Sequence, residues 1–315
     1  MTEQRVTNGI SRAAFVRRAY PYDWVILGYC LLMVTSIIAF GRPLNQYVSS
    51  LIFYGSIGLL VPAVVLLVDE NRNRVFEFVR LLYPALLFTS FYRQTGDLMF
   101  LFFDQFYDWQ LVAFERAVFG VHPTLYIDSN LLNVWLNEPF MFGYFMYYPM
   151  IPAFLLPLFI RRERLVIKQF LTTACIVFFA SYLLFSLYPT EGPRWHFAAE
   201  YLHTVDGPVF RPMVNFVIEE GAVRGGAMPS SHTAIAVVIM LFLFRYHRVW
   251  GWISAPVVVL LAIGTFWGRF HYVSDTIAGI VMAVLATWLV WHRYHTWKVE
   301  DPVSEPVSRR TQHVA

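Results

Sequence analysis

The apolar residues of this chain gather in about eight long stretches of about 15–22 residues each, and polar segments separate them. A helix needs roughly 20 apolar residues to cross the hydrocarbon core of a bilayer, so each stretch is expected to form one transmembrane helix. The pattern therefore predicts an all-α polytopic membrane protein. The expected spans are 24–40, 50–68, 75–92, 140–160, 169–188, 230–244, 252–267 and 274–291.

Two of these spans carry residues that membrane helices normally avoid. Glu77 and Arg80 lie near the start of the third span, which makes it the weakest of the set. Pro149, Pro152 and Pro157 lie in the fourth, where neighbouring helices can satisfy the carbonyl groups that the prolines leave free.

Basic residues occupy the N-terminal tail and alternate connections between the spans. With an even number of spans, all of these segments lie on one side of the membrane, and the positive-inside rule makes that side the cytoplasm. We therefore expect both termini in the cytoplasm. The basic residues are Arg5, Arg12, Arg17, Arg18, Arg72, Arg74, Arg161, Arg162, Arg164, Lys168, Arg245, Arg248, Arg293 and Lys298.

The composition agrees with a membrane protein and argues against a soluble one. Hydrophobic residues make up 57% of the chain and charged residues 14%, and a soluble fold of this length could not bury so much apolar surface. The net charge of +3 gives no indication of a nucleic-acid partner. Cys30 and Cys175 both lie inside apolar stretches, so we expect them to be buried packing residues and not a disulfide or metal ligands.

The longest polar connections, 93–138 and 189–229, fall on the outer face in this topology. Within the first, residues 109–119 mix apolar and charged side chains as an interfacial helix does. Three segments with polar, chemically reactive side chains, 189–195, 225–233 and 268–275, lie at the outer ends of the last four spans.

Ser230 and Ser231 precede the sixth span, where a serine can cap the free N–H groups of a helix start. Those N–H groups and the helix dipole also favour an anion, and Gly225 and Gly226 permit its close approach. His232 follows directly. The segment is therefore either an anion site with an adjoining histidine or an ordinary helix cap with an interfacial histidine.

His271 and Asp275 stand four residues apart and share one face of a helix. A carboxylate beside a histidine fixes its tautomer and stabilises its positive charge, as nucleophilic catalysis requires. The alternative is a hydrogen bond that caps the eighth span. Arg194 and Arg269 could bind phosphate in a bidentate way or extend toward lipid headgroups.

These three segments together resemble the signature of the type 2 phosphatidic acid phosphatase superfamily. That signature consists of an arginine-bearing loop, a Pro-Ser-x-His motif and an arginine–histidine–aspartate segment. The second part is similar to Pro229-Ser230-Ser231-His232, the third to Arg269, His271 and Asp275, and the first, more loosely, to Pro193 and Arg194.

The chain departs from the common pattern of that superfamily in three places. It has no lysine near Leu187, it has Ser231 where glycine is usual, and Arg269 stands closer to the histidine. These departures, together with the segments 114–123 and 269–275, resemble the branch that contains inositol phosphorylceramide synthases.

The resemblance implies four parts of the chain. Residues 1–22 would form a cytoplasmic tail, 23–75 two accessory transmembrane helices, 76–292 a six-helix catalytic core, and 293–315 a cytoplasmic tail that we expect to be disordered. The topology expected from the loop charges places the active site on the non-cytoplasmic face.

The resemblance implies a double displacement without metal or cofactor on a lipid phosphate or phospholipid. His271 would attack phosphorus and form a phosphohistidine, Asp275 would orient it, and His232 would protonate the leaving oxygen. The phosphate-binding residues would be Arg194, Arg269, Ser230 and Ser231.

Three other functions are alternatives to this one. A lipid phosphatase would differ only in having water as the acceptor. A metal hydrolase could use His232, His271 and Asp275 as ligands, although two adjoining arginines would repel a cation. A transporter or lipid-binding scaffold would more often place its polar groups at mid-membrane.

Overall fold

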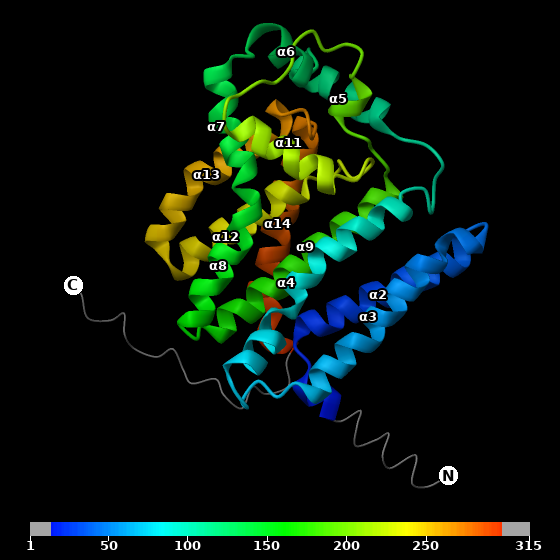
Figure 1. Cartoon of the computed structure of the whole chain (residues 1–315), viewed down its shortest axis with the longest axis vertical. Helices are drawn as coiled ribbons and strands as arrows, with labels where there is room; N and C mark the ends of the chain where they lie inside the picture. Colours follow the sequence, from blue (N-terminus) through cyan, green and yellow to red (C-terminus); the bar gives the residue numbers. More distant parts are fainter. Residues whose placement is uncertain (1–13, 298–315) are drawn as a thin grey trace.

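The computed structural model describes residues 14–297, which form a bundle of long helices with a cap of short ones at one end (Figure 1). The long helices are α2 (Pro21–Phe40), α3 (Val48–Leu67), α4 (Arg74–Asp97), α7 (Val134–Phe145), α8 (Tyr147–Ile160), α9 (Arg164–Leu187), α12 (Ser231–Tyr246), α13 (Arg248–Trp267) and α14 (Val273–Arg293). The cap holds α5 (Asp108–Phe119), α6 (Pro123–Asn130), α10 (Pro193–His196) and α11 (Phe210–Gly221). Short 3₁₀ turns lie at Leu44–Tyr47 and Tyr294–Thr296.

Each of the expected spans coincides with one helix, except the fourth, which coincides with α7 and α8. Six helices in the described part of the chain are long and apolar enough to cross a bilayer, and α7 with α8 would make a seventh span. The remaining expected span, 230–244, corresponds to α12, which has 16 residues, fewer than a full crossing normally needs. The protein is thus a polytopic all-α membrane protein.

The fourth span is not one straight helix. It begins at Val134, earlier than the expected start at 140, and it bends by 43° between α7 and α8. Above the bend, α7 lies against α13 because two glycines permit contact between the backbones. A β-carbon at Gly143 would lie 2.4 Å from the carbonyl carbon of Leu260, and one at Gly264 would lie 2.3 Å from the oxygen of Phe140. Below the bend, α8 packs against α9 and α12 instead.

Helix α9 lies at the centre of the bundle and is the most buried of the long helices. It contacts α2, α4, α8, α12 and α14. Cys175 lies in this helix and Cys30 in α2, and both thiols are buried and free, which confirms the expected packing role.

The polar residues of the weak third span are paired inside the bundle. Arg80 of α4 forms a buried ion pair with Asp23 of α2, with Nη2 2.7 Å from Oδ2. Glu77 accepts hydrogen bonds from Arg74 at 2.7 Å and from Arg164 at 2.6 Å. These pairs join α2 and the start of α9 to α4, so the charges connect the packed helices.

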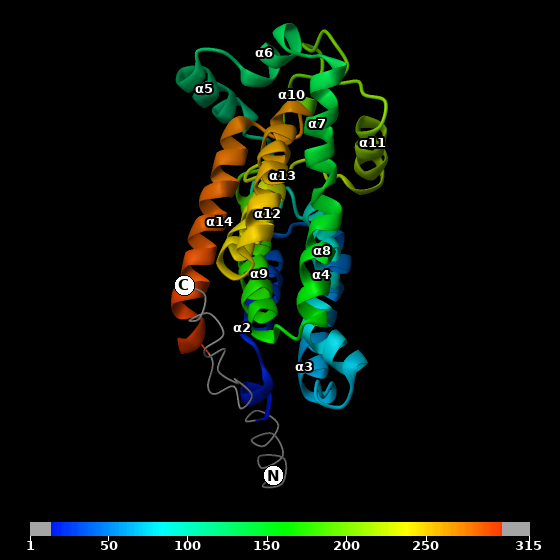
Figure 2. The same ribbon diagram turned by 90° about the vertical axis from the view of Figure 1, so that its left-hand side faces the viewer.

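The connections 93–138 and 189–229 form the cap at one end of the bundle (Figure 2). The expected interfacial segment 109–119 corresponds to α5, whereas α10 and α11 were not expected from the sequence. The start of α2 and the end of α14 lie together at the opposite end (Figure 2), as an even number of passes requires. The tail expected to be disordered lies mostly outside the described residues.

Candidate active site

The starts of α12 and α14 meet at the capped end and bring the second and third motif segments together. The backbone N–H of Ser230 donates to the carbonyl oxygen of Asp275 at 2.9 Å. Gly279, one turn further along α14, lies so close that a β-carbon there would be 2.4 Å from the Ser230 oxygen. This contact between helices brings the two histidines to one place.

His271 is buried, and a backbone carbonyl orients its ring. Nδ1 lies 2.8 Å from the carbonyl oxygen of Ala227. Because a carbonyl oxygen can only accept, Nδ1 carries the hydrogen, and in the neutral imidazole Nε2 keeps its lone pair. Asp275 Oδ2 lies 3.7 Å from the same Nδ1, too far for a hydrogen bond, so its influence is electrostatic.

The carboxyl group of Asp275 has its own partners and one unused oxygen. Oδ2 accepts the backbone N–H of Tyr272 at 2.8 Å, which makes a cap for α14. Oδ1 is buried and has no hydrogen-bond partner among the described residues. Asp275 therefore caps the helix and lies beside the histidine, and the hydrogen bond that orients His271 is accepted by Ala227 and not by this carboxylate.

His232 lies next to His271, with 5.8 Å between the ring centroids. The Tyr147 ring lies 4.1 Å from its ring and the Tyr144 ring 5.3 Å away. Nδ1 of His232 is buried without a hydrogen-bond partner among the described residues. The imidazole is thus held by ring packing, and its Nδ1 is not used by the described part of the fold.

Both histidines line one small cavity of about 60 Å³, together with Arg194. The Arg194 guanidinium lies 5.0 Å from the centre of the Trp195 ring and has no hydrogen-bond or ion-pair partner among residues 14–297. An unpaired guanidinium beside two histidines is suited to an anion.

A second, larger cavity of about 480 Å³ adjoins the first and lies among α4, α8, α9 and α11. It contains several phenol and hydroxyl groups from these helices. The two cavities share the lining residues Tyr92, Tyr144, Ile218, Ala222 and His232.

The loop that carries Arg194 is held by Asp108, a residue that sequence reasoning missed. Its carboxylate accepts the backbone N–H groups of Glu191 at 2.8 Å and Gly192 at 2.9 Å, and the hydroxyl of Tyr272 at 2.8 Å. Asp108 therefore joins the first motif segment to the third. No local sequence pattern predicts this, since the partners stand 83, 84 and 164 residues away.

Arg269 is not brought into the small cavity. Its guanidinium donates to Asp128 Oδ1 at 2.5 Å and to the carbonyl oxygen of His203 at 2.6 Å, and it lies 3.7 Å from the Tyr201 ring centre. Its backbone has a positive φ of 67°. These contacts fix the turn before His271 and connect it to the cap.

The two serines also differ in what they contact. Ser230 caps α12, with its hydroxyl 3.4 Å from the N–H and 3.2 Å from the hydroxyl of Thr233. Ser231 lines the larger cavity beside His232. Of the residues that the sequence predicted, the structure thus brings His232, His271 and Arg194 to one cavity and places Asp275 behind them.

Arg211 of α11 is a further arginine near the cavity that the sequence did not single out. Its guanidinium lies 5.7 Å from the ring centre of Phe270, which lines the small cavity. Burial, and then the charges of Arg194 and Arg269, lower its pKa to about 10. It therefore stays charged at neutral pH and adds to a cluster of positive charge.

Glu115 connects α5 to the start of α14. Its Oε1 accepts the N–H of Ser274 at 2.8 Å and the hydroxyl at 3.0 Å. Burial is the main reason why the pKa of this carboxyl group is raised.

Asp108, Glu191 and His196 form a group whose ligand atoms lie within 4.8 Å of one another, as a metal site requires. However, Asp108 already accepts three hydrogen bonds, and Glu191 is paired with Arg224. These contacts are those of a structural network in the cap.

The fold and this site define a class: a polytopic helical membrane protein with a buried pair of histidines and an unpaired arginine at one end of its bundle. The family model of the PAP2 superfamily matches residues 109–289, which is more than half of the chain, and the chain belongs to that superfamily. It is therefore a phosphatase-type enzyme. No curated protein and no solved structure matches it.

The matched region begins in α5 and ends in α14. It contains every residue that lines the small cavity except Tyr92 of α4. Helices α2, α3 and α4 lie outside it.

Proposed function

We propose that this protein is a lipid phosphotransferase that carries the transferred group on His271. The observation that supports this best is the hydrogen bond from His271 Nδ1 to the Ala227 carbonyl, which leaves Nε2 as a nucleophile. The same small cavity holds His232 as an acid and Arg194 as a cation.

In the first step, the Nε2 lone pair of His271 attacks phosphorus, and the bond from phosphorus to the leaving oxygen breaks. His232 gives its proton to that oxygen. In the second step, an acceptor hydroxyl attacks the phosphohistidine while His232 takes the hydroxyl proton. The bond between phosphorus and nitrogen breaks, and the electron pair returns to His271.

Arg194 and Arg211 would neutralise the phosphate oxygens on which charge grows. For Arg269 and Ser230 we propose positioning roles, because their polar groups are engaged with Asp128 and Thr233. The backbone at Ser231 would lie at the start of α12, where helix N–H groups favour an anion.

We also propose an alcohol as the acceptor, as in the inositolphosphotransferase-like branch. The larger cavity next to His232 supports this, because Thr89, Tyr147 and Tyr148 could hydrogen-bond a polyol. The alternative is a lipid phosphate phosphatase, in which a water molecule takes the place of the alcohol and the other groups act unchanged.

A product assay separates the two reactions. Purified protein is given a phosphoinositide or a phosphatidic acid, with and without added inositol or another alcohol. A transferase forms a new phosphodiester or phosphomonoester of the alcohol, whereas release of only inorganic phosphate or of the water-derived product would contradict the proposed acceptor.

For the membrane placement, we propose cytoplasmic termini and an active site on the opposite face. The basic residues of the connections and the position of the cap support this. A reporter fused after Gln312 should be cytoplasmic and one inserted near Asp206 should not. A cytoplasmic reporter at Asp206 would contradict the orientation. The division into 23–75 as accessory helices and 76–292 as the catalytic core stands as a proposal beside it.

A further inference from the structure

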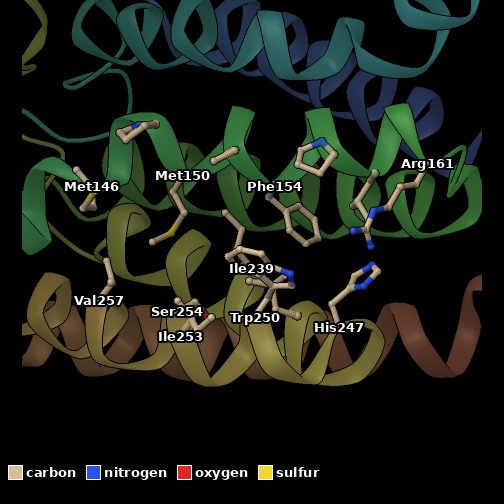
Figure 3. A pocket seen from close by; sticks show the side chains of 15 residues that line it. Met146, Met150, Phe154, Arg161, Ile239, His247, Trp250, Ile253, Ser254 and Val257 are labelled. Carbon is tan, nitrogen blue, oxygen red and sulfur yellow. The ribbon is translucent and has the colours of Figure 1, made fainter.

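A groove separate from the active site runs along α8, facing α12 and α13 (Figure 3). Its cavity has a volume of about 410 Å³ and shares no lining residue with the two cavities beside His232. Its lining begins at Met146, in the bend between α7 and α8, and ends at Arg161 and His247.

The bend explains why the groove exists. The glycine contacts at Gly143 and Gly264 hold α7 directly against α13, and the 43° turn then directs α8 away toward α9 and α12. A wedge of space remains between α8 and α13. Side chains such as Met150, Phe154 and Ile253 line it, so its walls are almost entirely apolar (Figure 3).

One end of the groove is cationic. Arg161 and His247 lie there with their side chains toward each other (Figure 3). His247 Nε2 lies 2.8 Å from Glu163 Oε2, so that carboxylate already has a partner. The Arg161 guanidinium has no hydrogen-bond or ion-pair partner within residues 14–297. This end therefore offers a guanidinium without a direct partner in the described residues, at the end of the bundle opposite the cap.

The length of the groove fits a lipid chain. Helix α8 has 14 residues and is therefore about 21 Å long, which exceeds the roughly 15 Å of hydrocarbon in one leaflet. An acyl chain that enters beside Arg161 would reach the bend at Met146.

We propose that this groove binds one anionic glycerophospholipid from the leaflet opposite the active site. Its phosphate lies against Arg161, and one acyl chain fills the wedge up to Met146. A phospholipid combines an anionic head with a long apolar chain, as the two ends of the groove require. Met146 precedes Tyr147, whose ring contacts His232, so the bound chain supports one wall of the active site.

The test uses purified full-length protein in detergent micelles and a phosphatidylglycerol with a photoreactive group at the end of one acyl chain. Crosslinks should map to peptides that contain Met146, Met150 or Val257. Unlabelled phosphatidylglycerol should compete at least about tenfold better than phosphatidylcholine, and inorganic phosphate should not compete. Crosslinks spread around the whole bundle, or equal competition by phosphatidylcholine, would overturn the proposal.

Variants then separate the two ends of the groove. Arg161→Ala should weaken competition by phosphatidylglycerol roughly tenfold, whereas the exposed neighbour Arg162→Ala serves as the matched control and should change it little. Ser254→Phe should block labelling by filling the wedge from α13. Labelling that survives both Arg161→Ala and Ser254→Phe would overturn the proposal. The crosslink map of the unaltered protein decides the matter even if a variant fails to fold.

Discussion

Buried charge occurs at both ends of this bundle, and the two clusters differ in how completely they are satisfied. At the end opposite the cap, Asp23 accepts hydrogen bonds from both terminal nitrogens of Arg80, from the Tyr83 hydroxyl and from the Tyr20 backbone N–H. At the capped end, His232 Nδ1 and Asp275 Oδ1 are equally buried and have no partner among the described residues.

We propose that this difference separates a structural cluster from a reactive one. A buried polar atom without a partner costs about 1–3 kcal/mol, so packing alone does not favour keeping it. The Asp23–Arg80 cluster joins α2 to α4, and both oxygens of Asp23 are hydrogen-bonded. The histidine cluster keeps unused nitrogen and oxygen atoms beside a cavity, where a substrate could meet them.

The largest effect is expected when the proposed nucleophile is removed. His271→Ala should lower turnover by at least about 10³-fold and abolish an acid-labile, base-stable phosphoenzyme. His232→Ala should lower turnover about 10²–10⁴-fold with an ordinary lipid, yet still form the phosphoenzyme from a substrate whose leaving group has a low pKa. Single-turnover labelling measures both. Phosphate trapped on His232 would reverse the two roles.

At the Asp23–Arg80 cluster, removing a charged side chain should lower the stability of the fold and leave the turnover nearly unchanged. Arg80→Ala leaves the Asp23 carboxylate buried without its cation, which should cost about 3–5 kcal/mol. Thermal unfolding in detergent measures the loss, and the remaining folded protein should keep a near-normal turnover. Arg72→Ala, at an exposed arginine near the same end, is the control. A large fall in turnover at unchanged stability would contradict the structural role.

A smaller effect is expected at Arg211, whose charge we place near the phosphate. Arg211→Ala should weaken inhibition by vanadate about tenfold, since one charge-assisted contact is lost. Because its pKa is about 10, the charged form disappears as the pH rises through that value, and vanadate binding to the unaltered protein should weaken there. The exposed Arg116 of α5 provides the control as Arg116→Ala. Equal effects at both positions would indicate only a general surface charge.

The smallest effect should come from Glu115, where burial raises the pKa of the carboxyl group. A raised pKa in the folded state means that the folded protein holds the proton more strongly than the unfolded chain. This contribution is present at low pH and is lost as the pH rises through the raised pKa. Glu115→Gln should remove it, so the difference in melting temperature between the two proteins should change with pH. A difference that is constant from pH 4 to pH 7 would contradict the raised pKa.

The helices could be predicted from the sequence because each long apolar run has to satisfy its backbone internally in a membrane. The bend between α7 and α8 could not, since three prolines marked the fourth span and none of them lies at Met146. Its position depends instead on the contact of Gly143 with α13, which only the packed bundle creates.

The residues of the site also divide into those that the sequence predicts and those that it does not. His232, His271 and Arg194 could be predicted because each stands in a short local pattern at the end of a span. Asp108 and Arg211 could not, because their partners come from segments far away in the sequence. Arg269 stands in a motif, but its guanidinium is taken up by Asp128 from another part of the cap, and local spacing does not reveal this.

The group that fixes the tautomer of His271 is a main-chain carbonyl, at Ala227, and not a side chain. Every amino acid supplies that oxygen, so a point mutation at this position does not delete the acceptor. The orientation of the ring is therefore independent of the carboxylate of Asp275. Replacing Asp275 by asparagine would then change the electrostatic field at the nucleophile while the proton on Nδ1 stays in place. The substitution thus separates the electrostatic effect of the carboxylate from the choice of tautomer. The two effects change together in a site where a carboxylate accepts the hydrogen bond of the histidine directly.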